Sequence, residues 1–118
     1  MDSILNSTKK VLGIQADYSA FDHDVVMWIN SALGSATQLG VIPATMISDE
    51  TTAWSTFALD PDQLSMLKNY VYLKARLGFD PPATSFSIEA IERQIRELEF
   101  RLNVNREEDS WTDPSSAA

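Results

Sequence analysis

The residues best suited to chemistry in this sequence are its single histidine, His23, and the two acidic neighbours Asp22 and Asp24. Imidazole and carboxylate groups bind metal ions and transfer protons, so this group is the first candidate for an active site or a metal site. On a helix, however, consecutive side chains point about 100° apart, and these three cannot converge on one ion. The pattern therefore predicts an exposed helix start and no metal site.

The other patterns that suit catalysis or cofactor binding are weak. Asp60 and Asp62 are two nearby carboxylates, but Asp60 followed by Pro61 is a strong helix start, which favours capping over acid–base chemistry. No Gly-x-Ser-x-Gly motif occurs, and Gly34 and Gly40 fit neither a phosphate loop nor a dinucleotide fingerprint. We therefore expect no catalytic residues, no cofactor and no metal, and hence no enzyme.

The charge distribution argues against nucleic-acid binding. The chain has 17 acidic and nine basic residues, a formal net charge of −8. No lysine or arginine lies between Lys10 and Lys68. The acidic residues of that interval are Asp17, Asp22, Asp24, Asp49, Glu50, Asp60 and Asp62. A duplex-binding domain needs a basic surface that releases counterions, and this half of the chain offers the opposite. The pattern is compatible with a protein that lets DNA pass without holding it.

Length and composition indicate one globular domain. The chain has 118 residues, of which 44% are hydrophobic, and no cysteine for disulfides or thiolate metal sites. Its first residues lack the basic and apolar segments of a signal peptide, and no window has the roughly 20 apolar residues of a membrane helix. We expect synthesis in the cytoplasm and no membrane association.

The spacing of apolar residues predicts an all-α fold, a small bundle of about four to five helices. A short first helix is expected from about Ser3 to Leu12, capped by Asp2 or Ser3 and stopped by Gly13. Its apolar side is expected to consist of Ile4, Thr8, Val11 and Leu12. A loop without clear periodicity follows from Ile14 to Ala20.

The second helix is expected from Asp22 or His23 to Leu39, with Gly40 after it. Asp22 and Asp24 suit the capping of free N–H groups. One apolar stripe follows the helical period through Val25, Trp28, Ile29, Ala32, Ala36 and Leu39. The small residues near Gly34 predict a site where another helix approaches closely. From Val41 to Asp60 the chain reads as irregular, with a short helix near Glu50 to Phe57.

The third helix has strong start and stop signals, with Asp60 as its N-cap, Pro61 in its first turn and Gly78 after its last turn. It carries two separate apolar stripes. One consists of Leu64, Leu67, Val71 and Ala75. The other consists of Met66, Tyr70, Leu73 and Leu77, and is the candidate oligomer interface. One stripe is expected to face the core, with the other partly exposed and covered in an assembly. The alternative is a central helix that the rest of a small bundle covers on both sides.

The last helix is expected from Ser85 or Ser87 to about Asn103. Its apolar residues step by three and four as in a coiled coil, through Ile88, Ile91, Ile95, Leu98 and Leu102. This seam fits both the core of a bundle and a self-assembling coil. Phe100 and Val104 lie off the seam and predict a second apolar contact. Three favourable i,i+4 pairs follow the outside, Glu89–Arg93, Glu92–Arg96 and Glu97–Arg101.

The composition changes after Asn105, and we expect residues 1–106 to form the helical domain and residues 107–118 a flexible acidic tail. Trp111 lies alone among acids, serines and a proline. It is either an incidental exposed residue or the anchor of a tail that folds onto a partner.

Three segments together resemble the head–tail connector proteins of long-tailed bacteriophages. These segments are Tyr70–Pro82 (YVYLKARLGFDPP), Thr84–Phe86 (TSF) and Ile95–Val104 (IRELEFRLNV). The resemblance covers most of residues 20–106 in the order of elements and is specific from Tyr70 to Val104. One departure is Phe100, where a tryptophan is expected.

The resemblance implies a small all-helical virion protein that forms a ring, commonly dodecameric, beneath the portal of the phage head. Such a ring extends the DNA channel, offers a surface to the tail or a stopper protein, and has no catalytic residues or cofactor. It also implies that the C-terminal segment contacts the portal, with Arg106 and Trp111 as candidate portal-binding residues.

The leading hypothesis is therefore a structural subunit of the connector ring, made in the host bacterial cytoplasm and incorporated into the virion. Genomic DNA is expected to pass through the ring without specific binding. The alternative from the residues alone is a helical interaction or regulatory module that acts as a dimer. An enzyme or a nucleic-acid binder is a minor third reading, against which the single histidine and the missing basic patch argue.

Overall fold

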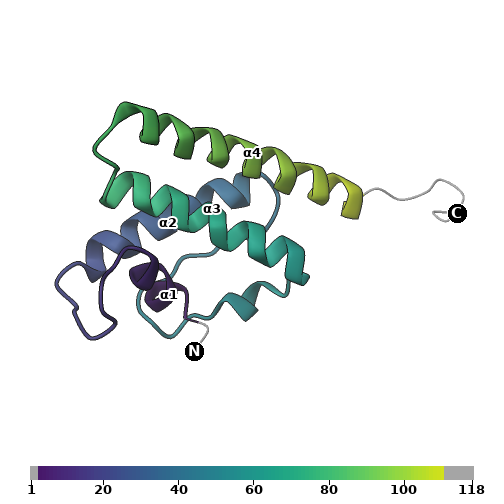
Figure 1. Cartoon of the computed structure of the whole chain (residues 1–118). Helices are drawn as coiled ribbons and strands as arrows, with labels where there is room; N and C mark the ends of the chain where they lie inside the picture. The colour runs from purple at the N-terminus through teal and green to yellow at the C-terminus, as the bar shows by residue number, and fades with distance from the viewer. Residues whose placement is uncertain (1–2, 111–118) are drawn as a thin grey trace, which may run out of the picture.

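The computed structural model describes residues 3–110, excepting the side chains of residues 105–110. Helices make up most of this part of the chain (Figure 1). The prediction of an all-α fold is confirmed. The elements in chain order are α1 (Ile4–Val11), α2 (Asp22–Gln38), the 3₁₀ helix η1 (Trp54–Phe57), α3 (Pro61–Phe79) and α4 (Ser85–Ser110).

Helix α3 is the central element, because it packs against α2 on one side and α4 on another (Figure 1). Helix α1 contacts both α2 and α3 and closes the remaining side. The fully buried apolar side chains come from all of these elements. They include Ile4, Val25, Ile29, Leu33, Trp54, Leu67, Val71 and Leu102. None of the described helices combines the length and the apolar character that a membrane span requires.

Helix α1 begins as predicted, with the Ser3 hydroxyl accepting a hydrogen bond from the backbone N–H of Asn6 at 3.2 Å. Its start is also fixed to a distant segment, since Ser3 forms an isolated antiparallel bridge with Ala53. The indole N–H of Trp54 donates to Ser7 Oγ at 2.9 Å. The predicted apolar side is partly wrong, because Val11 is 47% exposed.

Helix α2 begins at the predicted residue but without the predicted cap. Its N-cap is Phe21, and no side chain accepts a capping hydrogen bond there. The Asp22 carboxylate instead pairs with Lys9 of α1, at 2.7 Å between Nζ and Oδ1. Of the small residues expected at a close helix approach, Ala32 and Ala36 are fully buried, but the expected tight contact at Gly34 is wrong. That glycine is exposed, and a Cβ added to it would meet no atom within 4 Å.

The segment between α2 and η1 is irregular, as expected, yet it is anchored to the core. Ile42 and Ile47 are buried. The Asn30 side chain of α2 holds the backbone of Ile47 by two hydrogen bonds, donating to its carbonyl at 2.9 Å and accepting from its N–H at 2.8 Å. The expected short helix is the single turn η1, which buries Trp54 and Phe57.

Helix α3 starts as predicted, since Asp60 Oδ1 accepts a hydrogen bond from the backbone N–H of Gln63 at 2.8 Å. Its end differs from the prediction, because Gly78 lies inside the helix, which continues to Phe79. The glycine is required by packing. A Cβ at position 78 would lie 2.5 Å from the indole ring of Trp28, so the absent side chain lets α2 and α3 approach.

Helix α4 is longer than predicted and ends at Ser110 instead of near Asn103. The residues after Asn103 include no glycine or proline before Pro114, and arginine and glutamate are strong helix formers, so charge alone does not stop the helix. The helical backbone therefore crosses the boundary expected at residue 106. Residues 111–118, the rest of the predicted tail, lie outside the described residues.

The predicted seam of α4 faces α3, with Ile95 and Leu102 buried and Ile88, Ile91 and Leu98 half-buried. Of the three predicted surface pairs, Glu97–Arg101 forms an ion pair, with 2.6 Å between the guanidinium nitrogen and Oε1. Phe100, expected to make a second apolar contact, is 68% exposed.

Candidate functional site

The residues that first suggested chemistry lie at the starts of α2 and α3. Asp22 is occupied by its ion pair with Lys9, whereas His23 and Asp24 are exposed on the first turn of α2. Asp60 is a helix cap. Within residues 3–110, no three His, Cys, Asp or Glu side chains lie close enough together to hold a metal ion. The other candidate features lie on the surface of the protein.

A buried lysine that the sequence analysis missed organises one of these surfaces. Lys9 is 1% exposed, and its ammonium group donates to the backbone carbonyls of Ala16 at 3.0 Å and Tyr18 at 2.8 Å. Together with the Asp22 carboxylate, these acceptors satisfy the charge, which is what allows a lysine to be buried. Lys9 thereby fixes the loop between α1 and α2 against both helices.

The fixed loop carries an exposed group of aromatic rings, which we call the aromatic corner and which consists of Tyr18, Phe21 and Phe79. The centroids of Tyr18 and Phe21 lie 5.6 Å apart, and those of Phe21 and Phe79 lie 5.3 Å apart in an edge-to-face contact. Tyr18 is 51% and Phe21 41% exposed. Rings held rigidly at a surface are suited to contact with another protein.

The candidate oligomer interface on α3 is divided by the fold. Tyr70 is fully buried, and its hydroxyl donates to Glu99 Oε2 on α4 at 2.8 Å. Burial and this hydrogen bond raise the pKa of Tyr70 well above its usual range. Met66, Leu73 and Leu77 are half-buried. The other stripe is the core stripe, since Leu67, Val71 and Ala75 are fully buried and Leu64 is half-buried. Only the three outer residues of the candidate interface can reach a partner in this conformation.

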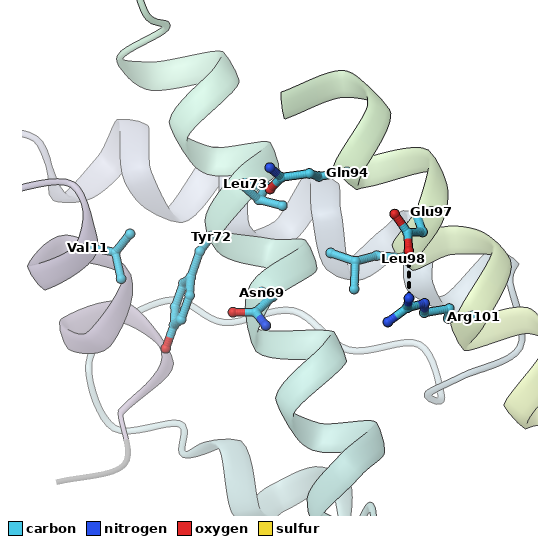
Figure 2. Close-up of a pocket in the computed structure, with 8 residues that line it drawn as sticks. All are labelled: Val11, Asn69, Tyr72, Leu73, Gln94, Glu97, Leu98 and Arg101. Carbon is cyan, nitrogen blue, oxygen red and sulfur yellow. Dashed lines mark hydrogen bonds and ion pairs between the residues drawn. The ribbon is translucent and has the colours of Figure 1, made fainter. Parts of the chain in front are cut away.

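Leu73 contributes to an open groove of about 650 Å³ between α1, α3 and α4, which we call the three-helix groove. Figure 2 shows Val11 of α1 on one side and the α4 side chains on the other, with α3 as the floor. The lining residues are Val11, Asn69, Tyr72, Leu73, Gln94, Glu97, Leu98 and Arg101. The combination of the apolar side chains Val11, Leu73 and Leu98 with mostly polar side chains along α4 suits the binding of a side chain or helix from another protein.

The groove could not be located from the sequence, although the half-buried stripe containing Leu73 pointed to the correct helix. Val11 was expected in the core, and nothing in the spacing placed α1 opposite α4. Of the candidate portal-binding residues, Arg106 lies on the backbone of α4 beyond the last described side chain. Trp111 lies outside the described residues.

Comparison with known protein families supplies the identity that the surfaces alone do not. The model of one family, described as phage connector protein, matches residues 4–109, which is nearly the whole of the described chain. No curated protein and no solved structure gave a significant match. On the family match, together with the all-helical fold, this chain belongs to the phage connector proteins, which are structural components of phage particles.

Proposed function

We propose that this chain is one subunit of a homo-oligomeric ring, expected to be a dodecamer, that joins the portal of a phage head to the tail or a stopper protein. The family match supports a structural connector role. The observation that carries the ring is the presence of two different apolar surfaces on one subunit. These are the three-helix groove, with Val11 on its side, and the aromatic corner at the loop between α1 and α2.

A ring subunit needs two such surfaces, because neighbours in a ring meet head to tail and each contact joins unlike patches. In the proposed contact, an aromatic side chain of the corner of one subunit enters the groove of the next. The half-buried Leu73 then contributes to the interface from the groove floor, with Met66 and Leu77 of the candidate interface on the same helix. Lys9 supports this contact by holding Tyr18 in position through its backbone carbonyl.

The acidic surface suits a channel through which genomic DNA passes without specific binding. Residues 11–67 contain seven acids and no lysine or arginine, so phosphate groups meet repulsion along this part of the chain. We expect no retardation of duplex DNA by the purified protein in a gel at about 0.15 M salt, where counterion release from basic contacts is weak. Tight binding that falls steeply with salt would contradict the channel role.

The portal contact is assigned to the end of α4 and the residues that follow it, with Arg106 and Trp111 as its candidate residues. A large aromatic side chain commonly contributes about 2 kcal/mol or more to an interface. Trp111→Ala should therefore weaken attachment to portal-bearing heads while leaving the helical content unchanged. Removal of residues 111–118 should do the same, and unchanged attachment of both variants would exclude this segment from the portal contact.

The ring itself is tested by the mass of the protein in solution, alone and with purified portal, by sedimentation and electron microscopy. We expect a large closed ring when portal is present. Val11→Arg should prevent ring closure, because it places a charge in the groove. The matched control is Met46→Arg, since Met46 is 79% exposed and distant from the groove in the chain. A protein that remains a dimer whether or not portal is added would instead favour the regulatory module.

A further inference from the structure

Helix α4 carries two apolar-rich rows with coiled-coil spacing, one on each side. The inner row is the seam that faces α3, made of Ile88, Ile91, Ile95, Leu98 and Leu102. The outer row steps by four and three through Phe86, Ala90, Arg93, Glu97, Phe100 and Val104. At about 100° per residue, the centres of the two rows lie about 150° apart, so the outer row points largely away from the rest of the chain, with Glu97 at its edge also lining the three-helix groove. Packing of α4 against α3 uses the inner row alone, so it does not explain the apolar residues of the outer row.

The outer row is open to solvent where its residues are largest. Phe86 is 80% and Phe100 68% exposed, and Arg93 and Glu97 between them are exposed as well. At 1.5 Å per residue, the two phenyl rings lie roughly 21 Å apart along the helix axis. Two phenylalanines exposed at the two ends of one row, with a pair of opposite charges between them, form a contact surface about one helix wide.

The order of residues in this row is complementary to itself when it is reversed. If two copies lie antiparallel, Phe86 faces the partner's Val104 and Ala90 faces the partner's Phe100. Arg93 then faces the partner's Glu97, which also pairs with Arg101 of its own helix at 2.6 Å, and the two-fold axis repeats each contact. Large side chains thus meet smaller ones, and both charge pairs are opposite. A parallel pairing in register would place Arg93 against arginine and Glu97 against glutamate, which is unfavourable.

We infer that the outer row of α4 pairs two copies of this chain into an antiparallel, two-fold dimer. The inference does not rest on the proposed ring. Neighbours in a ring are related by the ring axis and meet through unlike patches, whereas this contact joins one patch to its copy. The dimer is therefore a form of the subunit outside the ring, or a contact between two separate rings.

The dimer is expected to be weak and reversible. A single pair of helices buries less than the roughly 1,200 Å² of a standard interface. The two-fold axis also brings Arg96 of both copies to the same exposed flank. Glu92, one turn earlier on each helix, offsets this repulsion only in part. Such an interface separates readily, as a subunit entering a ring requires.

The decisive experiment uses two charge reversals whose effects cancel only in a mixture. In Arg93→Glu the partner faces are all acidic, and in Glu97→Arg they are all basic, so each variant alone should dimerise roughly 10- to 30-fold more weakly. An equimolar mixture restores both opposite pairs and should form heterodimers of about wild-type affinity. Sedimentation equilibrium of the full chain over a concentration series measures the dimer affinity of each variant alone and of their mixture. A mixture no more associated than its components would overturn the proposal.

Two further measurements fix the surface and its direction. Phe100→Ala should weaken dimerisation at least about tenfold. Met46→Ala should leave it unchanged, since Met46 is even more exposed than Phe100 but lies outside α4. Because the chain has no cysteine, single-cysteine variants give clean cross-links. Oxidation of mixed Ala90→Cys and Phe100→Cys chains should join position 90 to position 100. Predominant 90-to-90 and 100-to-100 products would show a different pairing and overturn the antiparallel model.

Glu97 belongs to both the three-helix groove and the outer row, so the dimer and the ring are separated by variants at residues that belong to one surface alone. Phe100→Ala should lose the dimer but still enter rings with portal, and Val11→Arg should lose the ring but still dimerise. Loss of both assemblies in Phe100→Ala, with helical content intact by circular dichroism, would mean that the outer row belongs to the ring contact and not to a separate dimer.

Discussion

The Tyr70 hydroxyl and the Glu99 carboxylate join α3 to α4 by a hydrogen bond of 2.8 Å. The same tyrosine ring lies under the Lys74 ammonium, 5.3 Å from the ring centroid, and Lys74 donates to Ser35 Oγ of α2 at 3.1 Å. A chain of polar contacts therefore crosses the helical layers from α2 to α4 through the buried centre of α3. Its members have defined partners, which makes their removal informative.

Tyr70→Phe should destabilise the subunit by about 1.5–3 kcal/mol, the range for a hydrogen bond to a charged group. The ring remains to fill the core, so the loss reports the hydroxyl alone. Urea unfolding followed by circular dichroism measures the change. Tyr72→Phe is the matched control, because Tyr72 is half-buried on the same helix and no hydrogen bond of its hydroxyl occurs within the described residues. Equal effects of the two substitutions would contradict the assignment.

The stability should fall at alkaline pH because the pKa of Tyr70 is raised in the folded state by burial and by Glu99. Above about pH 10, the ordinary pKa of a tyrosine, the unfolded chain loses this proton while the folded chain keeps it. The unfolded state then binds fewer protons, and the free energy of unfolding falls by up to ~1.4 kcal/mol per pH unit. Below about pH 10 Tyr70 is protonated in both states, and its full contribution to the free energy of unfolding is present.

The difference in the free energy of unfolding between wild type and Tyr70→Phe isolates this effect, since the two proteins share every other ionisable group. The advantage of the wild type should shrink between pH 9.5 and 11. A difference that stays constant over that range would show that the pKa of Tyr70 is ordinary.

Lys9→Met should destabilise the subunit by about 3–5 kcal/mol, although methionine fills a similar volume. The substitution leaves the Asp22 carboxylate and the carbonyls of Ala16 and Tyr18 without their donor. Thermal or urea unfolding measures the loss, and Lys10→Met, at an exposed neighbouring position, should change little. A nearly neutral Lys9→Met would mean that water replaces the ammonium group.

Two glycine-to-alanine substitutions should have opposite signs. Gly34→Ala adds a methyl group in open space on the surface of α2, and should stabilise by about 1 kcal/mol through helix propensity. Gly78→Ala has the same propensity gain, but its Cβ would lie 2.5 Å from the indole of Trp28. Overpacking of this kind costs about 1–3 kcal/mol. Calorimetry of both variants provides the comparison, and two stabilising results would exclude a tight contact at Gly78.

The sequence was sufficient to predict the all-α class and the start of each long helix. Local signals carried these predictions, such as the Asp60 cap with Pro61 and the three-and-four spacing that ends at Leu102. The core stripe of α3 could be listed, though periodicity alone could not say which of its two stripes was the core. A cap and an apolar period act within a few residues, so one sequence contains them completely.

The remaining features depend on contacts between distant residues. Gly78 has the local appearance of a helix stop, but its role is set by Trp28, 50 positions earlier. Asp22 has the local appearance of a helix cap, but in the fold its carboxylate pairs with Lys9. The three-helix groove likewise depends on where α1 crosses α3. Such pairings are decided by tertiary packing, which overrides local preference.

Helix α4 rests mainly on α3, whereas α1, α2 and α3 contact one another in all combinations. Local stability therefore differs along the chain, and detachment of α4 costs less free energy than global unfolding. Its amide hydrogens should exchange with solvent through partial openings that leave the other three helices protected. A partner that binds the outer row only when α4 is folded would also slow this exchange, because it stabilises the folded helix.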